Sequence, residues 1–279
     1  MAADTAINSS ACDQLGWKLA VHAYTFKNFT IFECIDKTAS LGLKYMSLSG
    51  SVNLDGKKPV TTVDISDADL QRILDKTKAA GLKLVNIGVV QLPNDEAKSR
   101  KVFEFAKKAG IDTLVAEPPD DALDLVEKLC KEYNIKVAIH DHPRPSHYWN
   151  PDTVLAAVKG RTPLMGACAD TGHWLRSGLN PVECLKKLDG RVIVLHFKDL
   201  VPNDDANPAP DKKRKESKAM HDVPWGTGVG NLKAQMAELK RQNFHGAFCV
   251  EYEYHWDNSL PEVAECVKWF NQTAAELAK

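Results

Sequence analysis

The sequence predicts an α/β protein that folds as a single (β/α)8 TIM barrel. Eight short β-rich runs alternate with eight amphipathic stretches, and no linker or change of composition divides the 279 residues. No run leads into a G-x-G-x-x-G or G-x-x-x-x-G-K loop, which argues against the alternative, an open doubly wound sheet. One domain is therefore expected over residues 1–279, with an N-terminal extension at 1–15.

The expected elements follow from the change of hydrophobic period along the chain. Runs of β-type composition predict strands at 17–25, 43–48, 82–89, 112–117, 136–141, 164–170, 191–198 and 246–252. Apolar residues at helical spacing predict helices at 31–41, 68–80, 95–108, 121–133, 151–158, 181–187, 231–242 and 261–277. Four of these helices are expected to end at a glycine that tolerates positive φ, namely Gly81, Gly110, Gly160 and Gly190.

The composition of the chain bears on which classes of binding partner are expected. The 36 Lys and Arg residues against 37 Asp and Glu give a formal net charge of −1, which favours neither nucleic acid nor an anionic membrane as a partner. No apolar run approaches the ~20 residues that a membrane span needs. The seven cysteines are an odd number, and six of them lie in apolar patterns that predict reduced core thiols.

The first fifteen residues are small and polar, without the basic start and apolar stretch of a signal peptide. They also fit the start of an exported mature chain in which Met1 replaces a removed signal peptide. Localisation is therefore left open between cytoplasm and periplasm.

Side chains with metal-binding or acid–base chemistry gather at the C-terminal ends of five consecutive strands. In a TIM barrel these ends form the mouth in which catalytic groups lie. Residues two apart on a strand share a face, so these side chains can point into one mouth. From strand four to strand eight they are Glu117, His140 and His142, Asp170 followed by His173, His196 and Lys198, and Glu251.

This set of side chains predicts a metal centre. A single buried histidine or strand-end glutamate is more often a structural group than a ligand. Burying several ionisable groups together without a metal or an ionic partner, however, is energetically costly. Imidazole and carboxylate donors suit one divalent ion, Mn²⁺, Co²⁺, Zn²⁺ or Fe²⁺ or, less well, Mg²⁺.

Several motifs resemble the xylose-isomerase-like barrel superfamily, which includes sugar-phosphate isomerases and epimerases. They are D-x-x-H at 170–173, H-F-K-D at 196–199, V-P-x-G-x-G at 223–228 and the last strand with its glutamate at 251. The opening LAVHAYTF, followed by a helix and LGLKYMSL, is similar too, so the resemblance spans nearly the whole chain.

The resemblance implies a ligand set. Ketose 3-epimerases of this superfamily hold their metal with Glu, Asp, His and Glu from strands five to eight, and the two glutamates move the proton. Asp170, His196 and Glu251 match three of these positions. Strand five has His140 or His142 where those epimerases have glutamate, so the expected ligands are His140, Asp170, His196 and Glu251, with the choice of strand-five histidine left open.

The leading hypothesis is a metal-dependent isomerase or epimerase of a sugar or sugar derivative, acting through a metal-stabilised enediolate. Glu251 is the expected base, and His140 or Glu117 would return the proton from the other side. The residues expected to hold substrate hydroxyls or the developing oxyanion are His142, His173 and Lys198.

The connection after strand seven, 201–230, is unusually long. Its middle, NDDANPAPDKKRKESK, is charged and proline-bearing and is expected to stay outside as surface. In the following HDVPWGTGVGN, three glycines allow a sharp turn against a ligand. We expect His221 and Trp225 to cover the mouth as substrate-binding residues, with a solvated loop or a subunit contact as the alternative.

Two other functions fit the same residues. A lyase or dehydratase of a 3-keto sugar, 3-keto glycoside or inosose would also begin by removing a proton next to a polarised carbonyl. A sugar-binding barrel without catalysis is the third hypothesis. In each case the partner is a small-molecule sugar or sugar derivative, and a homo-oligomer is left open.

Overall fold

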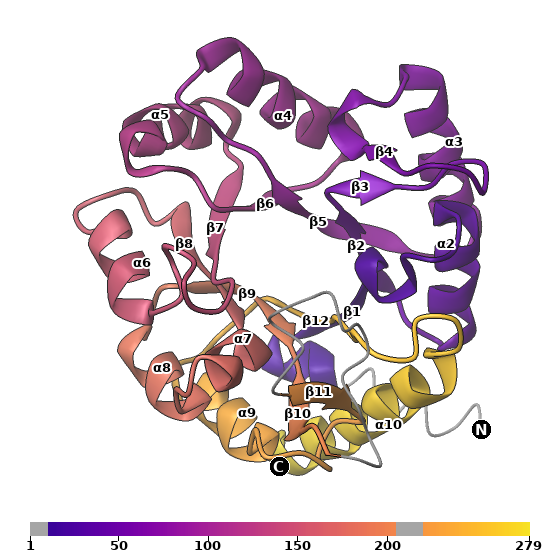
Figure 1. The fold of residues 1–279 in the computed structure, drawn as a ribbon, viewed down its shortest axis with the longest axis vertical. Coiled ribbons are helices and arrows are strands. Elements are labelled where there is room, and N and C mark those ends of the chain that lie inside the picture. Colours follow the sequence, from indigo (N-terminus) through magenta and orange to yellow (C-terminus); the bar gives the residue numbers. More distant parts are fainter. Residues whose placement is uncertain (1–10, 205–219) are drawn as a thin grey trace.

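Eight parallel strands close into a barrel in the order β1-β12-β9-β8-β7-β6-β5-β2 (Figure 1). The structure is a computed structural model that describes residues 11–204 and 220–279. The barrel strands are β1 (Lys18–His22), β2 (Tyr45–Ser49), β5 (Lys83–Val90), β6 (Thr113–Ala116), β7 (Lys136–His140), β8 (Met165–Asp170), β9 (Val192–Phe197) and β12 (Ala247–Val250). The predicted (β/α)8 barrel is therefore confirmed.

Helices surround the barrel and cover the outer face of its strands (Figure 1). They are α2 (Ile31–Ser40), α3 (Asp67–Ala79), α4 (Glu96–Ala109), α5 (Leu123–Tyr133), α6 (Pro151–Val158), α8 (Pro181–Lys187), α9 (Leu232–Arg241) and α10 (Leu260–Leu277). Each lies on a stretch that the sequence predicts as helical. Within the described residues, no helix is both long and apolar enough to cross a membrane.

The four glycines expected to end helices follow α3, α4, α6 and α8, but only Gly110 is itself the C-cap, and the other three lie one or two residues beyond it. Gly81, Gly110, Gly160 and Gly190 have φ values of 72°, 68°, 73° and 74°. A Cβ added at any of these positions would meet no atom within 4 Å. The backbone conformation, not lack of space, therefore favours glycine at these four positions.

Several short elements are additions to the predicted pattern. They are the hairpin of β3 (Ser51–Val52) with β4 (Val60–Thr61), the hairpin of β10 (Asp199–Pro202) with β11 (Met220–Val223), helix α7 (Thr171–Arg176) and the 3-10 turns η1 (Ala23–Phe26), η2 (Thr62–Asp64) and η3 (Asp120–Ala122). Such short segments contain too little sequence to show a period. Strand β1 consequently ends at His22, earlier than predicted, because the chain turns into η1.

The interior of the barrel is filled mainly by small side chains, and a separate, larger apolar cluster packs between the strands and the helices. The buried members of the interior cluster are Ala20, Val115, Ala138, Cys168, Val194, Ala247 and Cys249. Small residues at this level leave space above them for the larger polar side chains of the strand ends. The packing of the interior therefore leaves the mouth of the barrel available for polar side chains.

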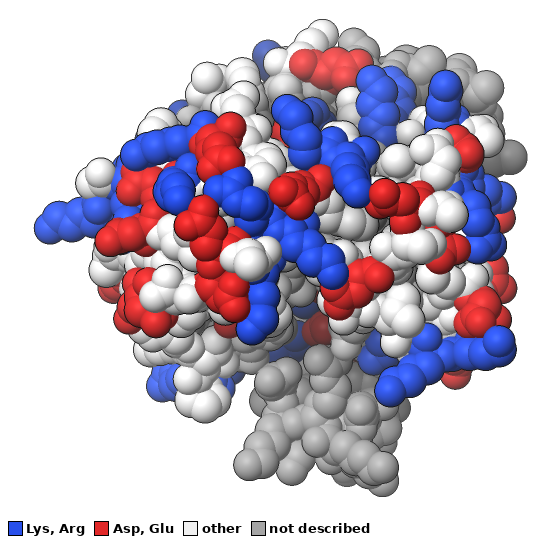
Figure 2. All heavy atoms as spheres, turned by 90° about the horizontal axis from the view of Figure 1, so that it is seen from above, with Lys and Arg blue, Asp and Glu red and all other residues white. Residues whose placement is uncertain are grey.

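Basic and acidic side chains are interspersed over the face shown in Figure 2. Most of the charged run expected as surface lies outside the described residues, because 205–219 are not described. The same applies to residues 1–10 of the expected extension.

The carboxylate of Asp199, at the start of β10, organises the glycine-rich segment after β11. It accepts backbone N–H bonds from Leu200 at 3.2 Å and from Gly226, Gly228 and Gly230 at 2.9 Å each. A Cβ at Gly228 would lie 2.4 Å from Asp199 Oδ1. These glycines therefore bring the backbone close to a carboxylate of the protein itself, which corrects the expectation that they turn against a ligand.

We predict that Asp199→Asn lowers the free energy of unfolding by about 2–4 kcal/mol, because both carboxylate oxygens accept N–H bonds and an amide offers one acceptor only. Chemical denaturation would measure the change. The matched control is Asp189→Asn, whose side chain is 47% exposed, and it should be nearly neutral. Equal stability of the two variants would contradict the role assigned to Asp199.

Candidate metal centre and active site

The C-terminal ends of the barrel strands open into a cleft of about 340 Å³. Its walls come from β1, β5, β7 and α7 and from the segments that follow β2 and β12. The lining includes His22, Tyr24, His140, His142, His173 and Glu251. Of the strand-end residues singled out from the sequence, His140, His142, His173 and Glu251 therefore face a common space.

Four buried side chains, two of which line this cleft, could together hold one metal ion. His140, Asp170, His196 and Glu251 each offer one ligand atom, and these atoms all lie within 4.8 Å of one another. Strand register brings them together, because Asp170 on β8 is the partner of His196 on β9 and His140 on β7 is the partner of Cys168. Since bonds from a first-row ion to N and O are about 2 Å long, only small movements would bring all four onto one ion.

The hydrogen-bonding pattern also fits a cation. Within the described residues, His140 Nε2 and both ring nitrogens of His196 have no hydrogen-bond partner, and Asp170 Oδ2 has ion-pair contacts only, the shortest to Lys198 Nζ at 2.9 Å. Their mutual contacts are long or poorly aligned, such as 3.6 Å from His140 Nε2 to Asp170 Oδ2 and 3.1 Å from His196 Nδ1 to Glu251 Oε2. Buried polar atoms without partners are rare because each costs about 1–3 kcal/mol. A divalent cation would satisfy His140 Nε2, Asp170 Oδ2 and one ring nitrogen of His196 together.

Lys198 brings a positive charge to the same carboxylates. Its Nζ lies 2.9 Å from Asp170 Oδ2 and 2.8 Å from Glu251 Oε2, and the side chain is buried. Burial disfavours the charged amine, but Asp170, Glu251 and Glu253 outweigh it and hold the pKa of Lys198 well above its usual value. Burial likewise disfavours the Glu251 carboxylate, but Lys198 and His196 outweigh it and hold the pKa of Glu251 well below its usual value. Glu251 is therefore ionised at neutral pH.

Glu117 lies behind the two strand-five histidines and orients them. Its Oε1 contacts His140 Nδ1 at 3.0 Å and also His142 Nδ1, and Ser146 Oγ donates to Oε2 at 3.1 Å. Burial would raise the carboxyl pKa, but the hydrogen bonds from the two histidines hold the pKa of Glu117 far below its usual value. Both oxygens thus have partners within the protein, and Glu117, expected to return a proton to the substrate, is not among the described residues that line the cleft.

The same contacts distinguish the two histidines. With Nδ1 held by Glu117, His140 presents Nε2 to Asp170, and His140 is the strand-five member of the four-residue group. Burial disfavours protonation of His140, but Asp170 and Glu117 outweigh it and raise its pKa to about 10. His142 belongs only to a second group, with Glu117 and His140, and its side chain is 40% exposed at the cleft.

An ionic network that the sequence analysis does not identify adjoins the cleft. Arg176 on α7 pairs with Glu253 at 2.9 Å and with Asp222 at 3.1 Å, and its Nη1 lies 3.2 Å from His173 Nδ1. The His173 ring lines the cleft as expected. Of the three charged residues, only Glu253 carries a sequence signal, because it follows Glu251 by two positions and so shares its face.

His22 closes the centre from the side of β1. Its Nε2 lies 3.0 Å from the Gly88 carbonyl oxygen, and its Nδ1 lies 3.3 Å from Glu251 Oε1. Burial lowers the pKa of His22 to about 4, even with Glu251 nearby. His22 is therefore neutral at pH 7, and the carbonyl identifies Nε2 as its protonated nitrogen.

Two residues that were expected to cover the mouth lie elsewhere. Trp225 is buried and packs against Phe197 and Phe270, with ring centroids 5.0 and 5.9 Å apart. His221 on β11 stacks on Tyr254 at 4.5 Å. Neither is among the described residues that line the cleft. The physical reason is that the backbone bonds to the carboxylate of β10 draw the segment after β11 against the outside of the barrel, where the indole ring is buried.

Comparison with a protein family agrees with this architecture. The family model of the xylose isomerase-like TIM barrel matches residues 35–273. No curated protein matches the chain.

Solved structures include several similar chains. A protein from Parabacteroides distasonis is 33% identical with a TM-score of 0.70, and the match covers 92% of this chain and 99% of that one. A D-tagatose 3-epimerase-like protein is 17% identical with a TM-score of 0.66, covering 94% and 98%. The IolI protein with a binding zinc atom is 17% identical with a TM-score of 0.67, covering 93% and 99%. The last two likenesses concern the fold alone.

We predict that Glu117→Gln lowers the affinity for Mn²⁺ or Zn²⁺ by about 10–100-fold, because the candidate ligand His140 loses the carboxylate that orients its ring. Titration calorimetry would measure the affinity. The control Glu132→Gln changes a surface glutamate that is 44% exposed and should leave metal affinity unchanged. Wild-type affinity in the Glu117→Gln variant would show that the contact does not orient a ligand.

Proposed function

The chain belongs to the xylose isomerase-like TIM barrel family, and we propose that it is an isomerase or epimerase of a sugar or sugar derivative that depends on one divalent metal ion. The observation that carries this proposal is the convergence of His140, Asp170, His196 and Glu251 at the base of an open cleft. The fold is shared with a D-tagatose 3-epimerase-like protein and a zinc-containing protein, which supports both parts of the proposal.

We propose His140, Asp170, His196 and Glu251 as the ligands. When bound, the ion would polarise a substrate carbonyl and stabilise negative charge on its oxygen. Two imidazoles and two carboxylates form a mixed set that suits Mn²⁺, Co²⁺, Zn²⁺ or Fe²⁺.

Glu251 is the proposed base. It lines the cleft, and its carboxyl group is ionised because of the ammonium group of Lys198. It can therefore accept a proton from the carbon next to a polarised carbonyl, leaving an enediolate.

His142 is the proposed acid on the other side of the substrate. Its Nδ1 is held by Glu117, which leaves Nε2 as the nitrogen that can meet a substrate in the cleft. This carboxylate–histidine pair replaces the expected direct role of Glu117, which instead orients the ring that returns the proton.

Lys198 and His173 are proposed to stabilise the negative charge that develops on substrate oxygens. The Lys198 ammonium is already fixed by the carboxylates, so little reorganisation is needed when charge appears beside it. Arg176 holds the His173 ring through Nδ1, and Nε2, which lies 3.6 Å from Asp170 Oδ2, is the nitrogen proposed to meet a substrate hydroxyl.

Reaction in D₂O separates this function from its alternatives. NMR of ketoses and 3-keto sugars incubated with the Mn²⁺-loaded protein should show deuterium in an intact sugar. Release of water or of a glycosidic substituent would instead assign a lyase or dehydratase. Binding without either change would assign a sugar-binding barrel.

We predict that Glu251→Gln lowers kcat by at least roughly 100-fold, because it removes both the base and a ligand charge. Steady-state kinetics would measure the loss, with Glu265→Gln on α10, 62% exposed, as the control. Activity like that of the wild type in the Glu251→Gln variant would rule out Glu251 as the base.

We also predict that Lys198→Ala weakens transition-state stabilisation by roughly 2–4 kcal/mol, as judged from kcat/KM. Metal affinity should not fall, because the substitution removes a cation that lies 2.8–2.9 Å from two ligand carboxylates. Lys187→Ala, at an exposed position, is the control. A loss of activity explained entirely by weaker metal binding would contradict the assignment.

A further inference from the structure

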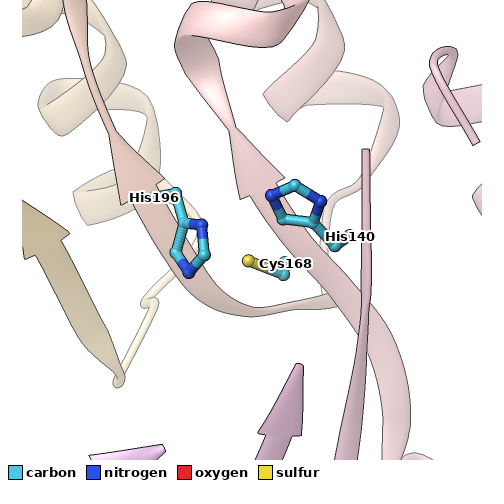
Figure 3. A group of neighbouring side chains, drawn as sticks. All are labelled: His140, Cys168 and His196. Atoms are coloured by element: carbon cyan, nitrogen blue, oxygen red, sulfur yellow. The ribbon is translucent and has the colours of Figure 1, made fainter. Parts of the chain in front are cut away.

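Cys168 lies beside the proposed metal centre, inside the barrel. It precedes Asp170 by two positions on β8, so both side chains face the barrel interior, and Cys168 is fully buried. Its sulfur points into the space between the rings of His140 and His196 (Figure 3). The sulfur and one nitrogen of each ring all lie within 4.8 Å of one another.

Each of the two histidines has a ring nitrogen that forms no hydrogen bond and could bind a metal ion. His196 is 0% exposed, and within the described residues neither of its ring nitrogens has a hydrogen-bond partner. Its Nδ1 is the nitrogen near Glu251, at 3.1 Å from Oε2, and Nε2 forms no ion pair with a described residue. His140 Nε2 is likewise buried without a hydrogen-bond partner. The buried cysteine therefore has two neighbouring imidazoles that can share a ligand with it.

We infer that the centre has a second, deeper position for a thiophilic divalent cation such as Zn²⁺ or Cd²⁺, held by Cys168, His140 and His196. Thiolate and imidazole donors together favour such ions, whereas carboxylates favour Mn²⁺ and Mg²⁺. Bonds of about 2.3 Å to sulfur and 2.0–2.1 Å to nitrogen place the donors close together, so the rings and the thiol need to move only by about an ångström.

The deeper position differs from the proposed catalytic one in its charged ligands. The group that contains Cys168 includes neither Asp170 nor Glu251. On binding, the S–H bond of Cys168 is replaced by a sulfur–metal bond, and the proton is released to solvent. A soft cation in this position would occupy both histidines while leaving the carboxylates to Lys198, and so would exclude the catalytic ion. This inference rests on the proposed function, because the two positions share His140 and His196.

Cadmium is a direct probe of this arrangement, because a cadmium–thiolate bond absorbs in the ultraviolet and a cadmium–imidazole or cadmium–carboxylate bond does not produce that band. The full-length wild-type protein is titrated with Cd²⁺ alone under reducing conditions. The matched variants are Cys168→Ser and Cys249→Ser. Cys249 belongs to the same interior cluster and is equally buried, but it is in no candidate metal group of the described residues.

We expect the charge-transfer band to reach its limit at one equivalent of Cd²⁺ in the wild type and in Cys249→Ser, and to be lost in Cys168→Ser. Circular dichroism checks that each variant is folded, and Cys168→Ala is the second variant if the Cys168→Ser protein is not. No band in the wild type, or a band that persists without Cys168, would overturn the inference.

A parallel Mn²⁺ titration of the wild-type protein, followed by electron paramagnetic resonance, keeps the two proposals apart. Mn²⁺ binding without a cadmium–thiolate band would overturn the deeper position and leave the proposed function intact. A cadmium–thiolate band without Mn²⁺ binding would support the deeper position as a soft-metal site and contradict the proposed catalytic centre.

Discussion

The mouth of this barrel depends on the compensation of buried charges at the ends of adjacent strands. Asp170 and Lys198 are both buried, and an isolated charge in such a place would cost far more free energy than the fold could supply. The contacts of Lys198 with Asp170 and Glu251, at 2.9 and 2.8 Å, make this burial tolerable. The two carboxylates could attract a cation, and the ammonium group of Lys198 could stabilise a developing oxyanion.

The barrel geometry explains why these groups meet. Strand register aligns Asp170 with His196, and the small side chains of the interior cluster leave room for imidazoles above them. Glu117 then fixes the orientation of His140 from behind. The small interior side chains, the strand register and the contact from Glu117 therefore together determine where the candidate ligand atoms lie.

The carboxylate of Asp199 has a structural role, although the glycine-rich segment that it binds looks like a ligand-binding motif in the sequence. Asp199 gathers the amides of Gly226, Gly228 and Gly230, as a helix N-terminus or a phosphate loop would gather those around an anion. The anion here is a side chain of the protein. The V-P-x-G-x-G motif therefore shapes the backbone around Asp199 and does not line the cleft, and Trp225 stabilises that fold by packing against Phe197.

The sequence by itself determined the number and order of the βα units, because hydrophobic periodicity and helix-ending glycines are local signals. It also determined which strand ends face the mouth, since alternation along a strand and closure of a barrel leave few options for Asp170, His196 and Glu251. Only the tertiary structure decided that Glu117 stands behind the histidines, that Trp225 enters the core and that Arg176 joins Asp222 to Glu253. These outcomes depend on contacts between segments far apart in the chain and on side-chain directions, and neither is encoded in a local period.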